Sequence, residues 1–349
     1  MTIKEIGSNF HTYTFPKETD FISCHKNAYY YGCGRCAINA LIKYHLKKKL
    51  WKRLFVPEYY CYEVIDSIKS TGIEVVLYSD YPLADDNALI KTIKFQKGDV
   101  LLRMNYFGLR NFRDNSDIDA TVIEDHSHDL FSDWAYKSNA DWCVASLRKT
   151  IPIPDGGILW SAKNDISCIE EPISYSDHSK LSKDRCLAMN MKKMYLDSVG
   201  NVDKKGFLEI FRRTEEKLGS RKCPALSSVS KEMIKNIPIS IIQKKYDNYI
   251  RLAKLISQEK CTILKGENHA SPFSLVLLFN SMHDRNAIRE ALKKNKIYST
   301  VLWEIRNEVA NDDVIGFSKR MLSLPIDFRY SDSDMLWMSN IINSELVKL

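Results

Sequence analysis

Long apolar runs are missing from this 349-residue chain. No segment approaches the roughly 20 consecutive apolar residues that a membrane-spanning helix needs, so we expect no membrane partner. Residues 1–7 contain no apolar core of a secretory signal. The sequence also lacks internal repeats and low-complexity segments, and its 44% apolar and 27% charged residues are ordinary for a globular protein. These features predict a globular, cytoplasmic protein.

A strong charge of one sign and a complete zinc motif are also absent. The net charge is +7, from 51 basic and 44 acidic residues. The densest basic stretch, residues 47–53, is typical of the solvated end of a helix, so we expect no nucleic-acid partner. Cys33 and Cys36 form a C-x-x-C, but no second Cys or His pair follows at zinc-finger spacing. Buried thiols are therefore favoured over a zinc site or a redox pair.

Strand-like and helix-like segments alternate in the first half of the chain. Short β-branched runs are separated by patterns with apolar residues at helical spacing. This alternation predicts an α/β fold with a mainly parallel sheet and helices on both faces. Such sheets carry their active sites at the carboxyl ends of the strands. The predicted strands are residues 54–56, 74–79, 99–104, 120–124, 142–145 and 157–160.

The pattern changes after about residue 165. Polar helical segments come first, then a β-α-β-like unit at residues 274–279, 285–294 and 297–302, and a final helix near 332–346. We predict a large α/β domain with connecting helices at 1–235 and a small α+β domain at 236–349.

A glycine-rich turn at residues 31–38 (Y-G-C-G-R-C-A-I) opens a predicted helix. Glycines at a helix start expose backbone N–H groups, and the helix dipole favours an anion there. The guanidinium of Arg35 can add a forked donor to a phosphate. A plain glycine turn before a helix is the alternative interpretation.

An apolar strand runs into a carboxylate at residues 122–128 (V-I-E-D-H-S-H). At the strand's carboxyl end, Asp125 can hold a protonated heterocyclic nitrogen through a charge-assisted hydrogen bond. A helix N-cap is an alternative role for this aspartate. A metal site formed by Asp125, His126 and His128 is a further alternative, which we weigh below the other two.

A lysine and a stiffened loop follow another predicted strand, in residues 146–157 (S-L-R-K-T-I-P-I-P-D-G-G). Lys149 is a candidate nucleophile, because a lysine in a dry pocket can lose its proton and attack a carbonyl. The prolines and the double glycine fix the path of the loop. A solvated surface charge is the alternative role for Lys149.

Tyrosines follow an earlier predicted strand, at residues 56–62 (V-P-E-Y-Y-C-Y). Their rings can stack on a planar cofactor, or they can lie half-buried at a helix start. Together the four segments supply a phosphate cradle, a carboxylate for a ring nitrogen, an aromatic platform and an amine. These are the groups needed to hold pyridoxal 5'-phosphate.

These segments resemble the DegT/DnrJ/StrS family of sugar aminotransferases, pyridoxal-phosphate enzymes of fold type I. Residues 122–128 resemble the family's V-I-E-D-x-x-[HQ] segment. Lys149 stands seven residues before Gly156, the distance between the family's Schiff-base lysine and its double glycine. The similarity extends from about Tyr29 to the C-terminal helix and includes residues 34–37, 105–108, 322–326 and 331–335.

The resemblance implies roles for individual residues. Lys149 would bind the cofactor and then move a proton, Asp125 would keep the ring nitrogen protonated, and His128 would orient Asp125 or contact the ring hydroxyl. The family's stacking aromatic falls on Cys61, so the platform would be a neighbouring tyrosine, Tyr60 or Tyr62. The other implied cofactor contacts are Gly34, Arg35, Cys36 and Ser146.

The resemblance also implies a reaction and a partner. An amino group would move from an amino acid, glutamate in the family, to a keto-sugar carried on a nucleotide, for surface polysaccharide or amino-sugar biosynthesis. The protein would be a homodimer in which the partner subunit closes each active site. Two other interpretations stay open: a sugar dehydratase-like enzyme that uses the same cofactor without the lysine, and a non-catalytic binding protein of the same fold.

Three positions depart from the family pattern. Arg35 replaces a hydroxyl residue in the phosphate turn, and Asn105 replaces a histidine. Ser146 precedes Lys149 by three residues instead of five, so the loop is two residues shorter.

Overall fold

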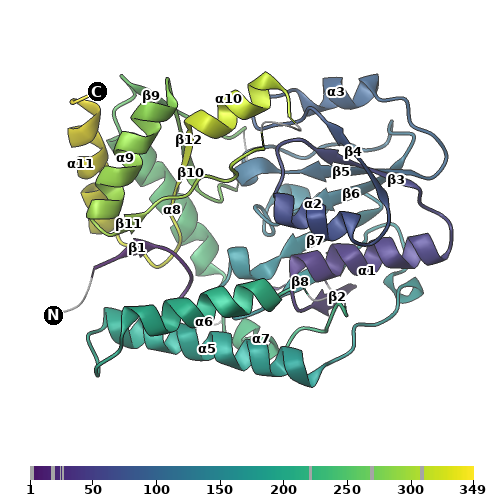
Figure 1. The fold of residues 1–349 in the computed structure, drawn as a ribbon, viewed down its shortest axis with the longest axis horizontal. Helices are drawn as coiled ribbons and strands as arrows, with labels where there is room; N and C mark the ends of the chain where they lie inside the picture. The colour runs from purple at the N-terminus through teal and green to yellow at the C-terminus, as the bar shows by residue number, and fades with distance from the viewer. Residues whose placement is uncertain are drawn as a thin grey trace.

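The computed structural model describes residues 4–16, 20–23, 25, 27–219, 222–267, 271–306 and 310–349. A large sheet with its helices occupies the right of Figure 1, and a smaller sheet with its own helices occupies the left. Two long helices, α5 (Ser176–Leu196) and α6 (Lys204–Lys217), pack against each other along the lower edge of this view.

The large sheet has seven strands in the order β2-β8-β7-β6-β5-β3-β4. Strands β4, β3, β5, β6 and β7 are parallel, whereas β8 runs antiparallel to β7 and to β2. The carboxyl ends of the parallel strands therefore meet at one edge, where such folds carry their sites. The strands are β2 (Ala28–Tyr31), β3 (Arg53–Pro57), β4 (Glu74–Tyr78), β5 (Asp99–Met104), β6 (Thr121–Asp125), β7 (Trp142–Ser146) and β8 (Gly157–Trp160).

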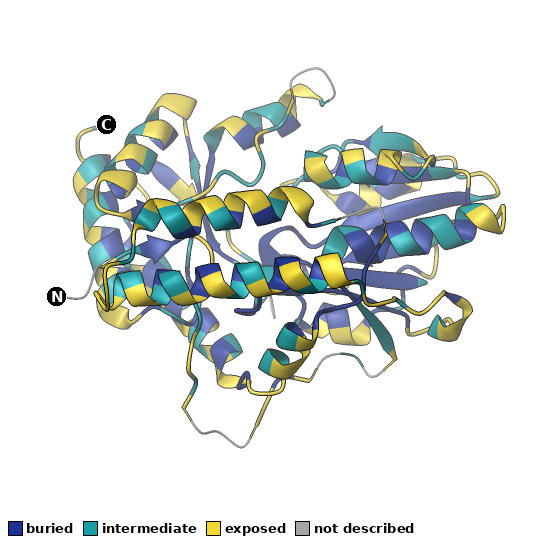
Figure 2. Cartoon of the chain, turned by 60° about the horizontal axis from the view of Figure 1, so that its bottom comes forward, coloured by how far each residue is buried: buried dark blue, intermediate teal, exposed yellow. Residues whose placement is uncertain are grey.

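Side chains alternate between the two faces of this sheet. Leu102 faces a core that it shares with α1 (Gly34–Lys47) and α2 (Tyr62–Lys69), whereas its neighbour Leu101 packs with α3 (Asp86–Thr92) on the other face. In Figure 2 the central strands are dark blue, and the covering helices carry exposed residues on their outer sides. The sheet is thus the middle layer between two layers of helices.

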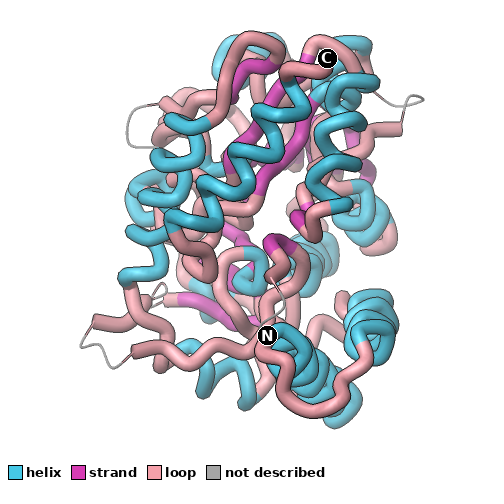
Figure 3. Tube along the Cα trace, turned by 90° about the vertical axis from the view of Figure 1, so that its left-hand side faces the viewer, coloured by secondary structure: helices cyan, strands magenta, loops and turns pink. Residues whose placement is uncertain are grey.

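The C-terminal part is built on an antiparallel sheet of three strands in the order β12-β10-β9. Helices pack on this sheet and bury a second apolar core with it, as the end view of Figure 3 shows. The elements are β9 (Cys261–Ile263), β10 (Leu275–Phe279), β12 (Met321–Leu324), α8 (Ser240–Leu255), α9 (Met282–Lys294), α10 (Asp312–Arg320) and α11 (Asp332–Leu346).

The predicted mainly parallel sheet with helices on both faces is confirmed. Each of the six strands predicted in the first half occurs within one residue of its expected ends, and the predicted final helix coincides with α11. Strand β2 was not predicted, because four residues directly before a glycine turn give too short a pattern. Short helices α4 (Asp133–Lys137) and α7 (Ser228–Ile234) complete the α/β part.

The strand predicted at 297–302 is wrong in its extent. Strand β11 (Ile297–Tyr298) has only two residues, and Thr300 makes an isolated bridge to Ser323 before the chain turns toward the large sheet. The predicted boundary after residue 235 stays a prediction, although β1 (Ile6–Gly7) pairs with β11 and so joins the start of the chain to its C-terminal part. Among the described residues, no helix is both long and apolar enough to cross a membrane.

Candidate active site

A pocket opens at the carboxyl ends of β3, β6 and β7, and we call it the first pocket. It holds about 700 Å³ of space, part of it open to solvent, which is the usual size of a small-molecule site. Seven of the predicted site residues line it together, while Cys36 and His128 do not. The seven are Gly34, Arg35, Tyr60, Cys61, Asp125, Ser146 and Lys149.

The glycine turn forms one wall of the first pocket. Cys33 is the N-cap of α1, and its sulfur accepts a hydrogen bond from the N–H of Cys36 at 3.3 Å. The N–H groups of Gly34 and Arg35 have no partner within the helix, because they lie in its first turn. A Cβ on Gly157 would lie 2.2 Å from the carbonyl carbon of Cys33, so only glycine lets the start of β8 pass this close to the turn.

Cys36 points away from the first pocket. Its sulfur lies 3.1 Å from that of Cys33, and both thiols are buried. Hydrogen bonding with the side chain of Cys36 lowers the pKa of Cys33 to about 6, although burial acts in the opposite direction.

Arginines and a glutamate lie at the open end of the first pocket. Nη2 of Arg35 donates to the carbonyl of Leu218 at 3.0 Å and lies 3.8 Å from Glu215. Nη2 of Arg148 donates to Glu215 at 2.6 Å, while its Nε is buried without a partner among the described residues. Burial opposes ionisation of Glu215, but Arg148 and Arg185 hold its pKa below the ordinary value.

Asp125 ends β6 and is fixed by hydrogen bonds on both of its oxygens. Oδ1 accepts from the N–H of Ser127 at 2.8 Å, and Oδ2 accepts from the hydroxyl of Tyr60. Tyr60 is buried, and burial together with the adjacent Asp125 raises its pKa well above the usual range. The structure therefore places Tyr60 as a hydrogen-bond partner of Asp125.

A buried polar network lies behind Asp125. His126 Nε2 is 3.1 Å from Glu124, and its Nδ1 is 3.0 Å from Asp129. Burial disfavours the charged ring, but Asp129 more than offsets this and raises the pKa of His126 well above the ordinary value. Asp125, His126 and His128, the alternative metal ligands, do not form a cluster that could hold a metal ion. Within the described ranges, the residues close enough to do so are Glu124, His126 and Cys143.

Lys149 ends the short turn that follows β7, and His128 lies beside it. The Nζ of Lys149 is 3.4 Å from Nε2 of His128. The N–H of Phe107 donates to Nδ1 of His128 at 3.2 Å, which places the proton of the neutral ring on Nε2. Burial, Lys149 and Lys245 hold the pKa of His128 well below the ordinary value. The histidine is thus neutral and faces the amine.

Trp303 is the aromatic residue of the first pocket that sequence reasoning missed. Its ring centroid is 5.5 Å from Nζ of Lys149 and 5.9 Å from the ring of Tyr60. It lies in an irregular loop after β11 and belongs to no motif, so only the fold brings it to the site. Tyr62, an alternative platform, lies outside the first pocket under the guanidinium of Arg306, which is 4.6 Å from its ring.

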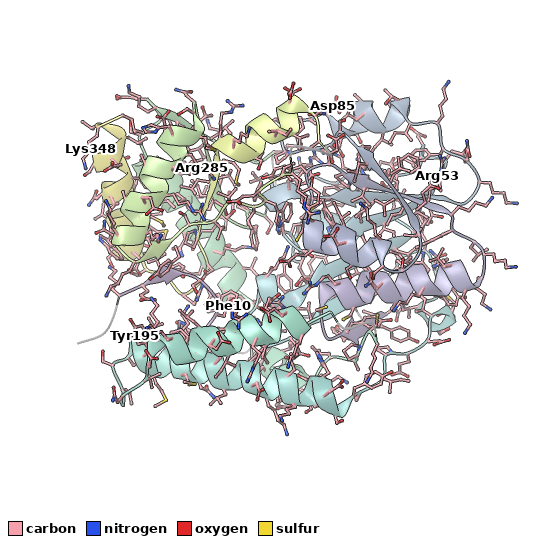
Figure 4. All side chains as sticks on the ribbon, viewed as in Figure 1. Phe10, Arg53, Asp85, Tyr195, Arg285 and Lys348 are labelled. Carbon is pink, nitrogen blue, oxygen red and sulfur yellow. The ribbon has the colours of Figure 1, made fainter. Side chains whose placement is uncertain are left out.

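A second cavity begins on the other side of Lys149 and extends to the small sheet. It holds about 1370 Å³ of space, part of it open to solvent, and shares Cys61, Arg148, Lys149 and Trp303 with the first pocket. Its walls come from distant segments, including Phe10 near the start of the chain, which Figure 4 labels. The other lining residues include His128, Lys245, Phe273, Ser274, Thr300, Ser323, Asp327 and Arg329.

No protein-family model and no curated protein matches the sequence. Three solved structures are similar in fold. Spr1654 of Streptococcus pneumoniae, assigned as a sugar aminotransferase, matches with 15% identity and a TM-score of 0.63, covering 92% of this chain and 86% of that one. DesI, solved with its TDP-sugar product, matches with 12% identity and a TM-score of 0.61, covering 92% and 81%. Helicobacter pylori PseC, an aminotransferase of pseudoaminic acid biosynthesis, matches with 14% identity and a TM-score of 0.60, covering 92% and 87%.

These comparisons define the fold. The chain has the pyridoxal-phosphate aminotransferase fold of type I, in the form found in sugar aminotransferases. The fold expected from the resemblance is therefore confirmed, and at this level of identity the chemistry has to be argued from the chain's own side chains.

Proposed function

We propose that the protein is an aminotransferase that uses pyridoxal 5'-phosphate. The observation that carries the proposal is the meeting of Lys149, Asp125 and the N-terminus of α1 in the first pocket. These groups come from three separate strand ends, and each suits a different part of the cofactor.

The groups of the first pocket fit the cofactor. A phosphate suits the N–H groups of Gly34 and Arg35, which have no partner within the helix, and the buried Nε of Arg148. Asp125 suits a ring nitrogen, because a carboxylate favours the protonated form of a heterocycle. Gly34 leaves room beside Ser146, since a Cβ on it would lie 3.2 Å from the serine Cβ.

The bound cofactor would supply an aldehyde carbon and a ring that accepts electrons. Lys149 would hold that carbon and then move a proton at the amino-acid Cα, because its amine is the nucleophile nearest the ring pocket. Asp125, fixed by Ser127 and Tyr60, would hold the proton on the ring nitrogen. The remaining assignments of Gly34, Arg35, Ser146 and Cys61 to cofactor contacts belong to this proposal.

His128 would keep the amine of Lys149 in place. Its Nε2 faces Nζ, and its ring is stacked between Phe273 at 4.4 Å and Trp303 at 5.5 Å. A neutral histidine adds no second positive charge beside the lysine. Cys36, which lies behind the turn, would support Cys33 and have no contact with the cofactor.

We propose glutamate as the amino donor and a keto-sugar on a nucleotide as the acceptor, in a cytoplasmic homodimer that serves polysaccharide or amino-sugar biosynthesis. The support is the resemblance of the motifs and the fold shared with DesI, which was solved with a TDP-sugar product. Lys149 in the pocket favours the transferase over a dehydratase that uses this cofactor without a lysine.

Borohydride fixation of the cofactor tests the proposal. The protein is incubated with pyridoxal phosphate, reduced, digested and analysed by mass spectrometry. We expect the reduced adduct on Lys149, and none there in Lys149→Ala, while the exposed-lysine control Lys163→Ala keeps it. Absence of an adduct on Lys149 would reject the proposal and favour a dehydratase-like or binding protein. In a separate sample that has not been reduced, glutamate should convert the bound cofactor to its amine form, and a panel of keto-sugars should restore the aldehyde absorbance.

A further inference from the structure

A lysine that the proposed mechanism does not use is buried in the second cavity. Lys245, on α8, is 9% exposed and lines the cavity. No hydrogen bond or ion pair of its amine is found among the described residues, although neighbouring Lys244 pairs with Asp332 at 3.2 Å on the surface. Burial lowers the pKa of Lys245 to about 8, although Asp129 and Asp327 act in the opposite direction, so at neutral pH most of the amine is still charged.

The two carboxylates that act electrostatically on Lys245, Asp129 and Asp327, form their hydrogen bonds with other residues. Asp327 forms a bidentate pair with Arg329, with bonds of 2.7 and 2.9 Å. Asp129 accepts hydrogen bonds from Asn105 at 2.8 Å and from Ser132 at 2.7 Å, and it also faces His126. Burying a charge without a partner is costly, so this wall of the cavity suits an anion that arrives with a ligand.

The lysine is close to the reacting end of the first pocket. Lys149 and Lys245 both depress the pKa of His128, which lies 3.4 Å from Nζ of Lys149. Lys149 and Lys245 line the same cavity, so a substrate held at Lys149 has open space toward Lys245. The hydroxyl of Ser274, buried without a partner among the residues described, borders the same space.

We propose that Lys245 and Ser274, which line the same cavity, form a subsite for an anionic oxygen group of the substrate. The subsite rests on the proposed function, because it orients a substrate toward Lys149. The anion is either a carboxylate of the amino-acid donor or a phosphate of a nucleotide-bound acceptor. An ammonium group serves both, since it is a point charge with three donors.

Binding of two unreactive probes distinguishes these sources. Glutarate represents the dicarboxylate donor, and inorganic pyrophosphate represents the nucleotide. Calorimetric titration uses the full chain loaded with pyridoxal phosphate, as wild type and as the variants Lys245→Met, Lys245→Arg and Lys244→Met. Loss of a charged hydrogen bond corresponds to about 10- to 100-fold weaker binding, which we expect for one probe in Lys245→Met. Lys245→Arg should recover most of the affinity, and Lys244→Met should match wild type.

Each outcome decides the proposal. Weaker glutarate binding in Lys245→Met assigns the subsite to the donor, and weaker pyrophosphate binding assigns it to the acceptor. Equal affinities in wild type and Lys245→Met, equal losses in Lys244→Met, or no binding of either probe to wild type would overturn it. Lys245→Gln replaces the methionine variant if the latter does not fold. Because the probes do not react, borohydride fixation at Lys149 tests the proposed function separately.

Discussion

The first pocket and the second cavity meet at Lys149 but are assembled in different ways. Most polar groups of the first pocket come from strand ends of the large sheet and from the start of α1, and Asp125 among them is held by a short hydrogen bond from Ser127. The second cavity is walled by segments from opposite ends of the chain, and its buried Lys245 has no such partner among the described residues. The difference indicates that the first pocket is organised before a ligand binds. In the second cavity, by contrast, the amine of Lys245 would gain its partner only from a ligand.

The first pocket and the second cavity also differ in how their charged side chains are paired. In the first pocket Glu215 is shared by Arg148 and two other arginines, and Asp125 is held by Tyr60. In the second cavity Arg329 pairs with Asp327, whereas the amine of Lys245 forms no ion pair within the parts of the chain described. Substitutions in the first pocket should therefore change the chemistry, whereas those in the second cavity should change substrate affinity.

The largest expected effect comes from Lys149→Ala, which removes the amine that lines both regions. We expect turnover to fall by at least about 10³-fold, because a nucleophile and a proton carrier are lost together and acid–base catalysis alone contributes about 10²–10⁴-fold. The cofactor's absorbance near neutral pH should change as its covalent attachment is lost. Single-turnover kinetics and spectra measure both, and near-normal turnover would remove Lys149 from the mechanism.

Asp125→Asn is expected to have the next largest effect. A neutral amide cannot hold a protonated ring nitrogen, and loss of a buried charge partner costs about 2–5 kcal/mol. The fold and part of the cofactor affinity should remain, so the loss should appear in kcat. Asp119→Asn, an exposed aspartate shortly before the same strand, is the control. Equal rates for the two variants would show that Asp125 has no role at the ring.

Tyr60→Phe tests whether the first pocket is organised in advance. Removal of the hydroxyl leaves Oδ2 of Asp125 without its tyrosine donor, and a hydrogen bond to a charged group contributes about 1.5–3 kcal/mol. We expect a loss in kcat between those of Asp125→Asn and wild type. Tyr62→Phe is the matched control, because that residue lies outside the pocket under Arg306. A normal rate in Tyr60→Phe would mean that Asp125 is positioned by Ser127 alone.

The sequence predicted the first pocket far better than the second cavity, for a physical reason. Strand ends and glycine turns have local patterns, so Asp125, Lys149 and Gly34 could be identified and do line one pocket. Trp303 and Lys245 lie on an irregular loop and on an ordinary amphipathic helix, where nothing local marks a binding residue. Tertiary packing alone brings them to the site.

The smallest expected effect comes from Arg35→Ala, at the residue that departs from the family's hydroxyl. Its guanidinium already donates to the carbonyl of Leu218 and lies 3.7 Å from Glu63. One hydrogen bond and two long ion pairs already hold the guanidinium where it is, and a partly exposed ion pair contributes only about 0–1 kcal/mol. We therefore expect the cofactor's dissociation constant to rise by no more than about fivefold, with the absorbance of the bound fraction unchanged.

Equilibrium dialysis against pyridoxal phosphate measures the effect of Arg35→Ala. Arg213→Ala is the control, because Arg213 lies on α6 and pairs with Asp184 at 3.3 Å, away from the pocket. Saturating cofactor should restore the turnover of Arg35→Ala, since ring chemistry belongs to Lys149 and Asp125. A dissociation constant equal to that of the control would mean that the N–H groups of the helix bind the phosphate without help from Arg35. A rise far above fivefold would instead mean that Arg35 leaves Leu218 and turns to the phosphate when the cofactor binds, so that the first pocket, like the second cavity, completes its charge balance only with a ligand.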